Sequence, residues 1–426
     1  MRRNPIVLGW RQQHLVNISA FIGQRIAFNR QKSFSRFIIR LSVVATTISV
    51  AVMIITLSFV SGFEKAVSDK VFSFWGHVRI AARQPQKVAL AEEEPIEANP
   101  ALAASVRGMS GVKSIQAFAT KSAILKTETD LDGVLMKGVG NDFSFQNLQP
   151  FLQAGRWLQF NDSTYSREIV LSTFTADQLH LKPGDRVLIY FVRPDGSLRP
   201  DRLTVVGLYK TGVEEYDKSF ALGDIKLLRR LNGWNENEIG GYEIFLNNYN
   251  RMGAVSEDVY ELPNFPPLWA TATSKELYPN IFDWLHVIGY NGKILIAIVI
   301  AIVAINFITC LFILVLERIR MVGVLKAVGA TNWTVQKIFI YHCLFITITG
   351  IAAGTFIGVG LLVLQQKTGF IKLKESEYYM HTAAVDIDPA FVVAVCAGTL
   401  ALSFLVLLIP SLLIKKIGPI TAIRFR

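Results

Sequence analysis

Four long apolar runs decide what this chain can fold into. They cover residues 41–60, 294–316, 343–364 and 390–414, and none of them contains Asp, Glu, Lys or Arg. An α-helix rises about 1.5 Å per residue, so roughly 20 apolar residues are enough to cross the hydrocarbon core of a bilayer. One such run suits the centre of a soluble domain, but four of them predict an integral membrane protein with four spanning helices.

The charge distribution predicts how these spans are oriented. The chain carries a net charge of +11, yet residues 1–40, 317–340 and 415–426 together carry +15 and all the others −4. Short basic segments beside spans stay in the cytoplasm, which places both termini and the 317–340 loop inside. The large 61–292 segment and the short 365–388 loop then lie outside. Because no basic face remains on the large soluble part, nucleic acid is excluded as a partner.

The outside segment reads as a mixed α+β domain. Strand-like stretches such as REIVLS and DRVLIYFV alternate with helical pieces such as DIKLLRRLNG. The fold class expected is therefore a four-helix membrane protein with a large α+β domain between helices 1 and 2. The expected parts are an amphipathic helix at 1–35, spans at 36–60, 293–316, 341–364 and 389–414, the domain at 61–292, loops at 317–340 and 365–388, and a tail at 415–426. A disordered basic tail is the alternative for 1–35.

The stretch YFVRPDGSLRPDRLTVVG, residues 190–207, predicts a projecting hairpin. Pro194, Gly196 and Pro200 interrupt two strand-like segments, and proline removes a donor from a strand ladder, so the tip is expected not to pair as regular strand. Arginines around the tip suit polar recognition. A solvated hairpin without a partner is the alternative.

Signatures of catalysis are missing from the sequence. There is no G-x-x-x-x-G-K-[ST] loop, no His/Cys metal spacing and no G-x-S-x-G nucleophile motif, so we expect no catalytic residue and no metal ligand. None of the spans has the carboxylate that ion-coupled transport usually needs. Energy for any work across the membrane is expected to come from another protein.

The loop LERIRMVGVLKAVGATNW, residues 316–333, predicts a short helix at the inner membrane surface. Ile319, Val322, Leu325 and Val328 recur at a spacing of three, which we interpret as an apolar stripe facing the spans. Gly329 suits the position after the helix, and Thr331 suits the N-cap of the next one. A simple basic anchor is the alternative to a partner-binding helix.

Span three carries Gly350, Gly354 and Gly358. Their four-residue spacing predicts one helix face that a neighbour approaches closely, with a hinge as the alternative.

The segment ERIRMVGVLKAVGATNWTVQKIF resembles the coupling helix of FtsX-like/MacB-like ABC permeases, which sits on a separate ATPase. Met321 departs from the pattern, since the family usually has an acid there. The resemblance implies an ATPase-coupling set of Glu317, Arg318, Arg320, Gly323, Lys326, Gly329 and Ala330. It also implies that the chain binds no cofactor itself, that ATP and Mg²⁺ act on the partner ATPase dimer, and that a second permease subunit completes a homo- or heterodimer.

Further segments resemble the lipoprotein-releasing LolC/LolE-type branch of this family. They are the first span with the Gly-Phe-Glu that follows it, VLMKGVG (where Gly140 replaces the usual Asp) and the ending GPITAIRFR. The branch implies a bacterial inner-membrane location, a periplasmic domain, lipoprotein cargo and a periplasmic carrier. Its carrier-binding hairpin corresponds to Arg193, Pro194, Asp195, Gly196, Arg199 and Pro200.

Exposing an acyl chain to water costs about 0.8 kcal/mol per CH₂. The release of a lipoprotein from the bilayer therefore needs an apolar cavity for its acyl chains. The candidate lining, which is equally consistent with ordinary packing or lipid contact, is Met53, Leu57, Phe59, Val60, Phe63, Ile294 and Ile298.

Two other functions fit the same family. One is a MacB-like efflux permease working with an adaptor and an outer-membrane channel. The other is an FtsX-like regulator of cell-wall hydrolases that transports nothing. The sequence leaves these alternatives open.

The charge asymmetry yields a test of topology. A cysteine introduced near Gly196 is expected to react with an impermeant thiol reagent in intact spheroplasts, whereas one in the 317–340 loop reacts only after lysis. The reverse labelling pattern would invert the topology.

Overall fold

The computed structural model describes residues 34–83, 92–161, 164–193 and 196–411. The amphipathic helix expected at 1–35 and the tail at 415–426 lie essentially outside these residues. The chain divides into two compact units. Of the described residues, a helical unit comprises 34–62, 288–370 and 385–411, and a domain unit comprises 63–287 and 371–384.

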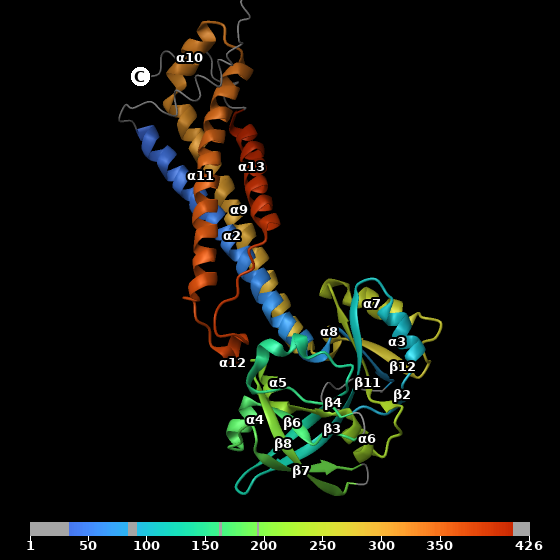
Figure 1. The fold of residues 1–426 in the computed structure, drawn as a ribbon. Helices are drawn as coiled ribbons and strands as arrows, with labels where there is room; N and C mark the ends of the chain where they lie inside the picture. Colours follow the sequence, from blue (N-terminus) through green and yellow to red (C-terminus); the bar gives the residue numbers. More distant parts are fainter. Residues whose placement is uncertain (1–33, 84–91, 162–163, 194–195, 412–426) are drawn as a thin grey trace, which may run out of the picture. The chain divides into compact units, whose positions relative to one another are not determined.

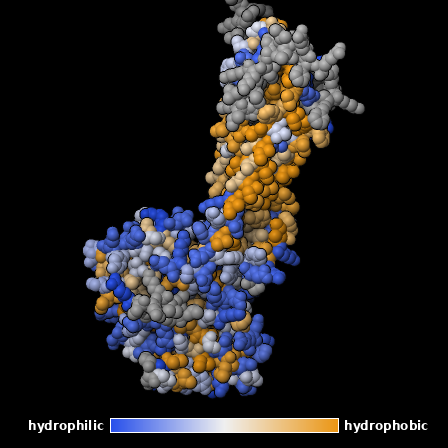
Figure 2. Space-filling model, turned by 180° about the vertical axis from the view of Figure 1, so that it is seen from behind, coloured by the Kyte–Doolittle hydropathy of each residue, from blue (hydrophilic) through white to orange (hydrophobic). Residues whose placement is uncertain are grey.

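Four helices are long and apolar enough to cross a membrane (Figure 1). They are α2 (Phe34–Trp75), α9 (Pro279–Glu317), α11 (Asn332–Thr368) and α13 (Pro389–Ser411). Each contains one of the apolar runs, and Figure 2 shows the apolar side chains that cover the helical unit. Two of the helices extend well beyond their apolar runs. Helix α9 runs without a break from Pro279 through the second apolar run, and α2 likewise continues past Val60 into the domain unit.

The glycines of α11 confirm the expected close approach between helices. A methyl group added to Gly350 would lie 2.7 Å from Thr46 Cβ, and one added to Gly354 would lie 2.6 Å from the carbonyl oxygen of Thr47. Both neighbours belong to α2. Because glycine has no side chain, α11 can lie directly on the first span, as helices do where small residues line membrane helix interfaces.

A ten-stranded mixed sheet forms the centre of the domain unit. Its order is β12-β1-β11-β3-β4-β9-β6-β8-β5, and β7 pairs with both β3 and β8. The strands are β1 (Val78–Ala82), β3 (Val112–Lys126), β4 (Leu131–Val139), β5 (Leu152–Gly155), β6 (Glu168–Ser172), β7 (Arg186–Val192), β8 (Leu198–Tyr209), β9 (Phe220–Asp224), β11 (Gly241–Leu246) and β12 (Trp269–Thr273). A separate pair joins β2 (Ile96–Glu97) to β10 (Glu238–Ile239).

Short helices complete the architecture. Those of the domain are α3 (Pro100–Arg107), α4 (Thr173–Gln178), α5 (Glu214–Ser219), α6 (Ile225–Asn232), α7 (Met252–Tyr260), α8 (Ser274–Leu277) and α12 (Glu375–Tyr378). In the helical unit, α10 (Ile319–Ala327) connects α9 to α11. The expected α+β fold class with four spanning helices is confirmed.

The contact between α11 and α2 yields a stability prediction. Gly354→Ala is expected to destabilise the protein by about 1–3 kcal/mol, because the new methyl would lie only 2.6 Å from the backbone oxygen of Thr47. Gly360→Ala in the same helix is the matched control, since nothing lies within 4 Å of its added methyl. Thermal unfolding in detergent should show a lower midpoint for the first variant only. Equal midpoints would contradict close packing at Gly354.

Candidate functional sites

The first candidate site is α10, which is held rigidly between two spans. Gly329 adopts a left-handed conformation with φ of 95°. Its N–H donates to the carbonyl of Lys326 (3.1 Å), and the N–H of Ala330 donates to that of Leu325 (2.9 Å). These two bonds form the Schellman motif that ends α10. Thr331 then accepts from the N–H of Thr334 and caps α11, so both expected cap positions are confirmed.

The faces of α10 differ from the sequence-based expectation. Val322 is fully buried in the helical core, and Leu325 packs against it, but Val328 is 83% exposed and Val324 is 56% exposed. The expected stripe including Val328 was therefore wrong. Residues three apart are separated by about 300° on a helix, so three repeats place Val328 half a turn away from Ile319.

The coupling set is consequently split between surface and interior. Glu317, Arg320 and Gly329 are exposed, whereas Gly323 is buried and Arg318, Lys326 and Ala330 are half-buried. The outward face of α10 combines a charged side chain, Arg320, with the two exposed valines. Such a mixed surface suits a protein interface better than a purely cationic one does.

The second candidate site is the β7–β8 hairpin. Its tip closes where the N–H of Arg193 donates to Ser197 and that of Gly196 donates to Arg193, both at 2.9 Å. Gly196 has a φ of 79°, which favours glycine. Pro194 and Asp195, two of the residues expected in the tip, lie outside the described residues.

Pro200 was expected in the tip, but it lies in β8 opposite Tyr190. Hydrogen-bonded and non-bonded pairs alternate along an antiparallel ladder. Counting from the bonded Arg193–Ser197 pair, Tyr190–Pro200 is a non-bonded pair, so no N–H is required there. The other strands that pair with β8, namely β5 and β6, begin their pairing only at Thr204. Pro200 therefore sits at an open edge, where proline is tolerated.

The two faces of the hairpin differ in character. Successive strand residues alternate sides, so the pairs Val192–Leu198, Tyr190–Pro200 and Leu188–Arg202 share one face. On this face Leu198 is 53% exposed. Arg199 stands opposite the buried Phe191, on the other face. The expected arginine cluster is therefore divided, and the accessible face is mainly apolar.

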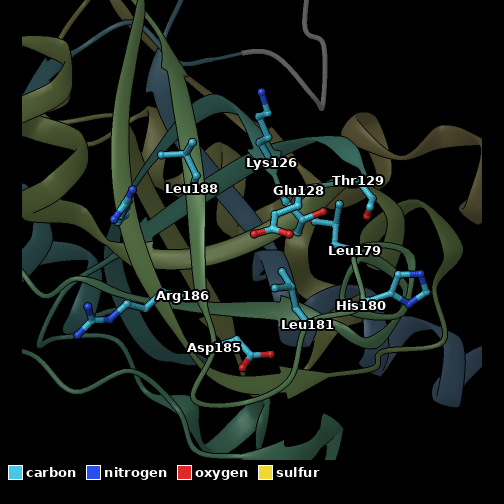
Figure 3. A pocket seen from close by; sticks show the side chains of 11 residues that line it. Lys126, Glu128, Thr129, Leu179, His180, Leu181, Asp185, Arg186 and Leu188 are labelled. Carbon is cyan, nitrogen blue, oxygen red and sulfur yellow. The ribbon is translucent and has the colours of Figure 1, made fainter.

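A pocket of about 700 Å³ opens at the base of this hairpin (Figure 3). The cross-strand pair Leu188 and Arg202 contributes to its lining. Figure 3 shows Lys126 at the end of β3 and Glu128 from the β3–β4 turn on one side, and His180 and Asp185 from the α4–β7 connection on the other. The accessible apolar face of the hairpin thus continues into a pocket lined by charges of both signs.

The candidate lipid-contacting residues do not form one group. Met53 is buried in the helical core, and Val60 packs on Gly292 of α9. Phe63 belongs to the domain unit, where its ring meets that of Trp284 at 5.2 Å. Ile294 and Ile298 are 44% and 52% exposed on α9, and Leu57 and Phe59 are half-buried on α2.

A buried ion pair marks the end of α2, and sequence analysis did not identify it. Lys137 of β4 and Glu243 of β11 are both fully buried, with Nζ and Oε1 2.7 Å apart. Lys137 also donates to the carbonyl of Phe74, near the end of α2, and its Nζ lies 4.2 Å from the ring centre of Trp75. A cation there complements the negative end of the helix dipole.

Burial away from water is the main influence on the pKa values of Lys137 and Glu243. Burial lowers the pKa of Lys137 to about 8, although Glu243 opposes the shift, and burial raises the pKa of Glu243. Arg79 also lies over the Trp75 ring, 4.1 Å from its centre, and pairs with Glu93 at 3.5 Å. The available signal was one charged residue inside each of two apolar stretches, a lysine in VLMKGV and a glutamate in GYEIFL.

Comparisons with known proteins cover nearly the whole chain. Residues 41–258 match the model of the MacB-like periplasmic core domain, and residues 293–419 match that of the FtsX-like permease C-terminal region. Among curated proteins, the chain is 23% identical to the lipoprotein-releasing system transmembrane protein LolC of Neisseria meningitidis, over 96% of this chain and all of that one. It is 25% identical to LolC of Xylella fastidiosa (96% and 99%) and 22% identical to LolE of Haemophilus influenzae (95% and 98%).

Two solved structures resemble part of the chain. One is the extracellular domain of the noncanonic ABC-type transporter YknZ from Gram-positive bacteria, with 14% identity and a TM-score of 0.32 over 46% of this chain and 99% of that one. The other is the periplasmic region of MacB from Actinobacillus actinomycetemcomitans, with 14% identity and a TM-score of 0.33 over 48% and 92%.

Proposed function

The chain belongs to the family of FtsX-like and MacB-like permeases, and from that membership we propose that it is the permease subunit of an ABC system that releases lipoproteins from the bacterial inner membrane. The observation that carries the proposal is the match to lipoprotein-releasing permeases along essentially the full length of both proteins. The finer proposal is a mechanotransmitting, type VII mechanism, in which ATP hydrolysis on a separate subunit moves the spans and the outside domain.

In this mechanism α10 is the contact with the ATPase dimer, which holds ATP and Mg²⁺. Val322 and Leu325 pack α10 on the helical core, so a push on its outward face is passed to α9 and α11. Arg320, Val324 and Val328 form that outward face. The orientation proposed has both termini and α10 in the cytoplasm and the domain in the periplasm, with a second permease subunit completing the complex.

The periplasmic carrier is proposed to bind the outer face of the hairpin. Leu198 and Pro200 offer an exposed apolar surface, and Arg202 extends it to the pocket. For the acyl chains of the cargo, Ile294 and Ile298 on α9 are the accessible contacts, together with Leu57 and Phe59 on α2.

Efflux through an outer-membrane channel and regulation of a hydrolase remain the alternative functions of the family. Proteins that co-purify with the chain distinguish the three: lipoprotein and carrier, a channel with its adaptor, or a cell-wall hydrolase.

The role of α10 is tested by Val328→Asp. A carboxylate introduced into a protein interface without a cationic partner costs several kcal/mol, so ATPase activity that co-purifies with the permease is expected to fall at least tenfold. Because Val328 is 83% exposed, the fold itself should tolerate the change. Charge reversal at the half-buried Arg318 or Lys326 would disturb helix packing as well.

Phe370→Asp is the matched control for this experiment. Phe370 is also an exposed apolar residue, at 53%, and it follows the opposite end of α11. Equal ATPase recovery with the two variants would show that α10 is only a membrane anchor.

The carrier-binding face is tested by two neighbouring substitutions in β8. Leu198→Asp is expected to weaken capture of the purified carrier at least tenfold, since it places a charge on the apolar outer face. Arg199→Asp alters the opposite face and should change capture less than threefold. The reverse result would favour recognition through the arginine, and unchanged capture by both variants would remove the hairpin from the carrier site.

A further inference from the structure

The connection between α11 and α13 is built as part of the outside domain. Residues 371–384 belong to the domain unit, although the residues on both sides of them belong to the helical unit. A bridge pairs Lys372 with Thr382, and the N–H of Leu373 donates to the carbonyl of His381 at 2.9 Å. The short helix α12 lies inside this closed loop. The connection is therefore a folded segment and not an extended linker.

Glu375, in the first turn of α12, attaches this loop to the sheet. Its carboxylate lies 2.5 Å from Nζ of Lys210, the residue that follows β8, and 2.9 Å from Nε2 of His381. Only 19% of the Glu375 side chain is exposed. The approach is close, because a methyl group added to Gly212 would lie 2.7 Å from the Glu375 carboxylate.

Two further residues, Tyr378 and Tyr379, attach the loop to the helices that continue from the first and second spans. Tyr379 has a φ of 58°, an uncommon conformation for a residue with a side chain, and its carbonyl accepts from Nζ of Lys70 on α2. Its ring meets Trp284 of α9 at 5.4 Å. The ring centre of Tyr378 lies 6.4 Å from that of Phe63 on α2 and 6.4 Å from that of Trp284 on α9.

The chain is attached to α2 again as it leaves the loop. The N–H of Asp386 donates to the carbonyl of Ser58 at 3.1 Å, and Ser61 donates to the Asp386 carboxylate at 2.9 Å. Both contacts lie in the helical unit. A segment between the third and fourth spans thus contacts α2 at Ser58, Ser61, Phe63 and Lys70.

We propose that residues 371–384 form a clasp through which α11 and α13 act on the outside domain, with Glu375 as its positioning residue. Motion of the third and fourth spans reaches the sheet through the Glu375–Lys210 contact, in parallel with the continuous helices α2 and α9. The clasp stays closed while the protein works. This inference rests on the proposed mechanical function and adds a second route for it.

The first test measures coupling in the complete complex, purified through a tag on this chain and reconstituted with lipoprotein and carrier. Glu375→Gln is expected to keep ATP hydrolysis within twofold of wild type and to lower lipoprotein transferred per ATP at least fivefold. Glu377→Gln is the matched control, since Glu377 pairs only with Lys374 in the described structure and both side chains are exposed, at 56% and 78%. The control should transfer normally.

The second test separates coupling from folding. In a variant whose three native cysteines are replaced, Lys210→Cys and Glu375→Cys are joined by a short bis-thiol reagent. Uncross-linked protein should be uncoupled, and cross-linking should restore transfer per ATP to within twofold of wild type. Cross-linking that abolishes transfer would overturn the closed clasp.

The outcomes also distinguish the clasp from the function on which it rests. Equal transfer per ATP by wild type and Glu375→Gln would contradict the clasp alone. A wild-type complex that hydrolyses ATP and transfers no lipoprotein would contradict the proposed function and the clasp together.

Discussion

The structure depends on how α2 ends. Phe74 and Trp75 are almost fully buried, so the same helix that begins as a membrane span finishes inside a protein core. Lys137 donates to the Phe74 carbonyl while paired with Glu243, and the Arg79 guanidinium lies over the Trp75 ring. A buried ion pair contributes little net stability, but removing one partner is strongly destabilising. The main effect of the pair is therefore to hold the end of α2 against β4 and β11, and its contribution to net stability is small.

Sequence patterns predicted those features of the fold that depend on local chemistry or on the thickness of the bilayer. The four spans follow from the thickness of the hydrocarbon core, the caps at Gly329 and Thr331 from backbone conformation, and the close approach of a neighbouring helix to α11 from the glycine spacing. The strand-like stretches of the domain, such as REIVLS and DRVLIYFV, were also predicted.

Contacts between distant parts of the chain were not predictable in the same way. Which face of α10 is buried depends on the helices packed against it. The sequence alone therefore does not show that an apolar residue such as Val328 is exposed. Pro200 looked like a strand breaker because the open edge beside β8 is a property of the sheet. Glu375 is one acid in a short charged loop, and nothing near it in sequence indicates Lys210 as its partner.

In the proposed mechanism, α10 receives the push of the ATPase, the sheet of the domain unit carries the apolar hairpin, and α2 and α9 each run without a break from the helical unit into the domain unit. The central claim of this mechanism is that ATP hydrolysis on a partner moves a lipoprotein out of the bilayer. The most direct measurement reconstitutes the complex in vesicles loaded with an acylated lipoprotein and follows its appearance on soluble carrier. The account predicts release that requires both ATP and the carrier. ATP hydrolysis with the lipoprotein retained in the vesicles, and a peptide or small molecule exported in its place, would contradict it.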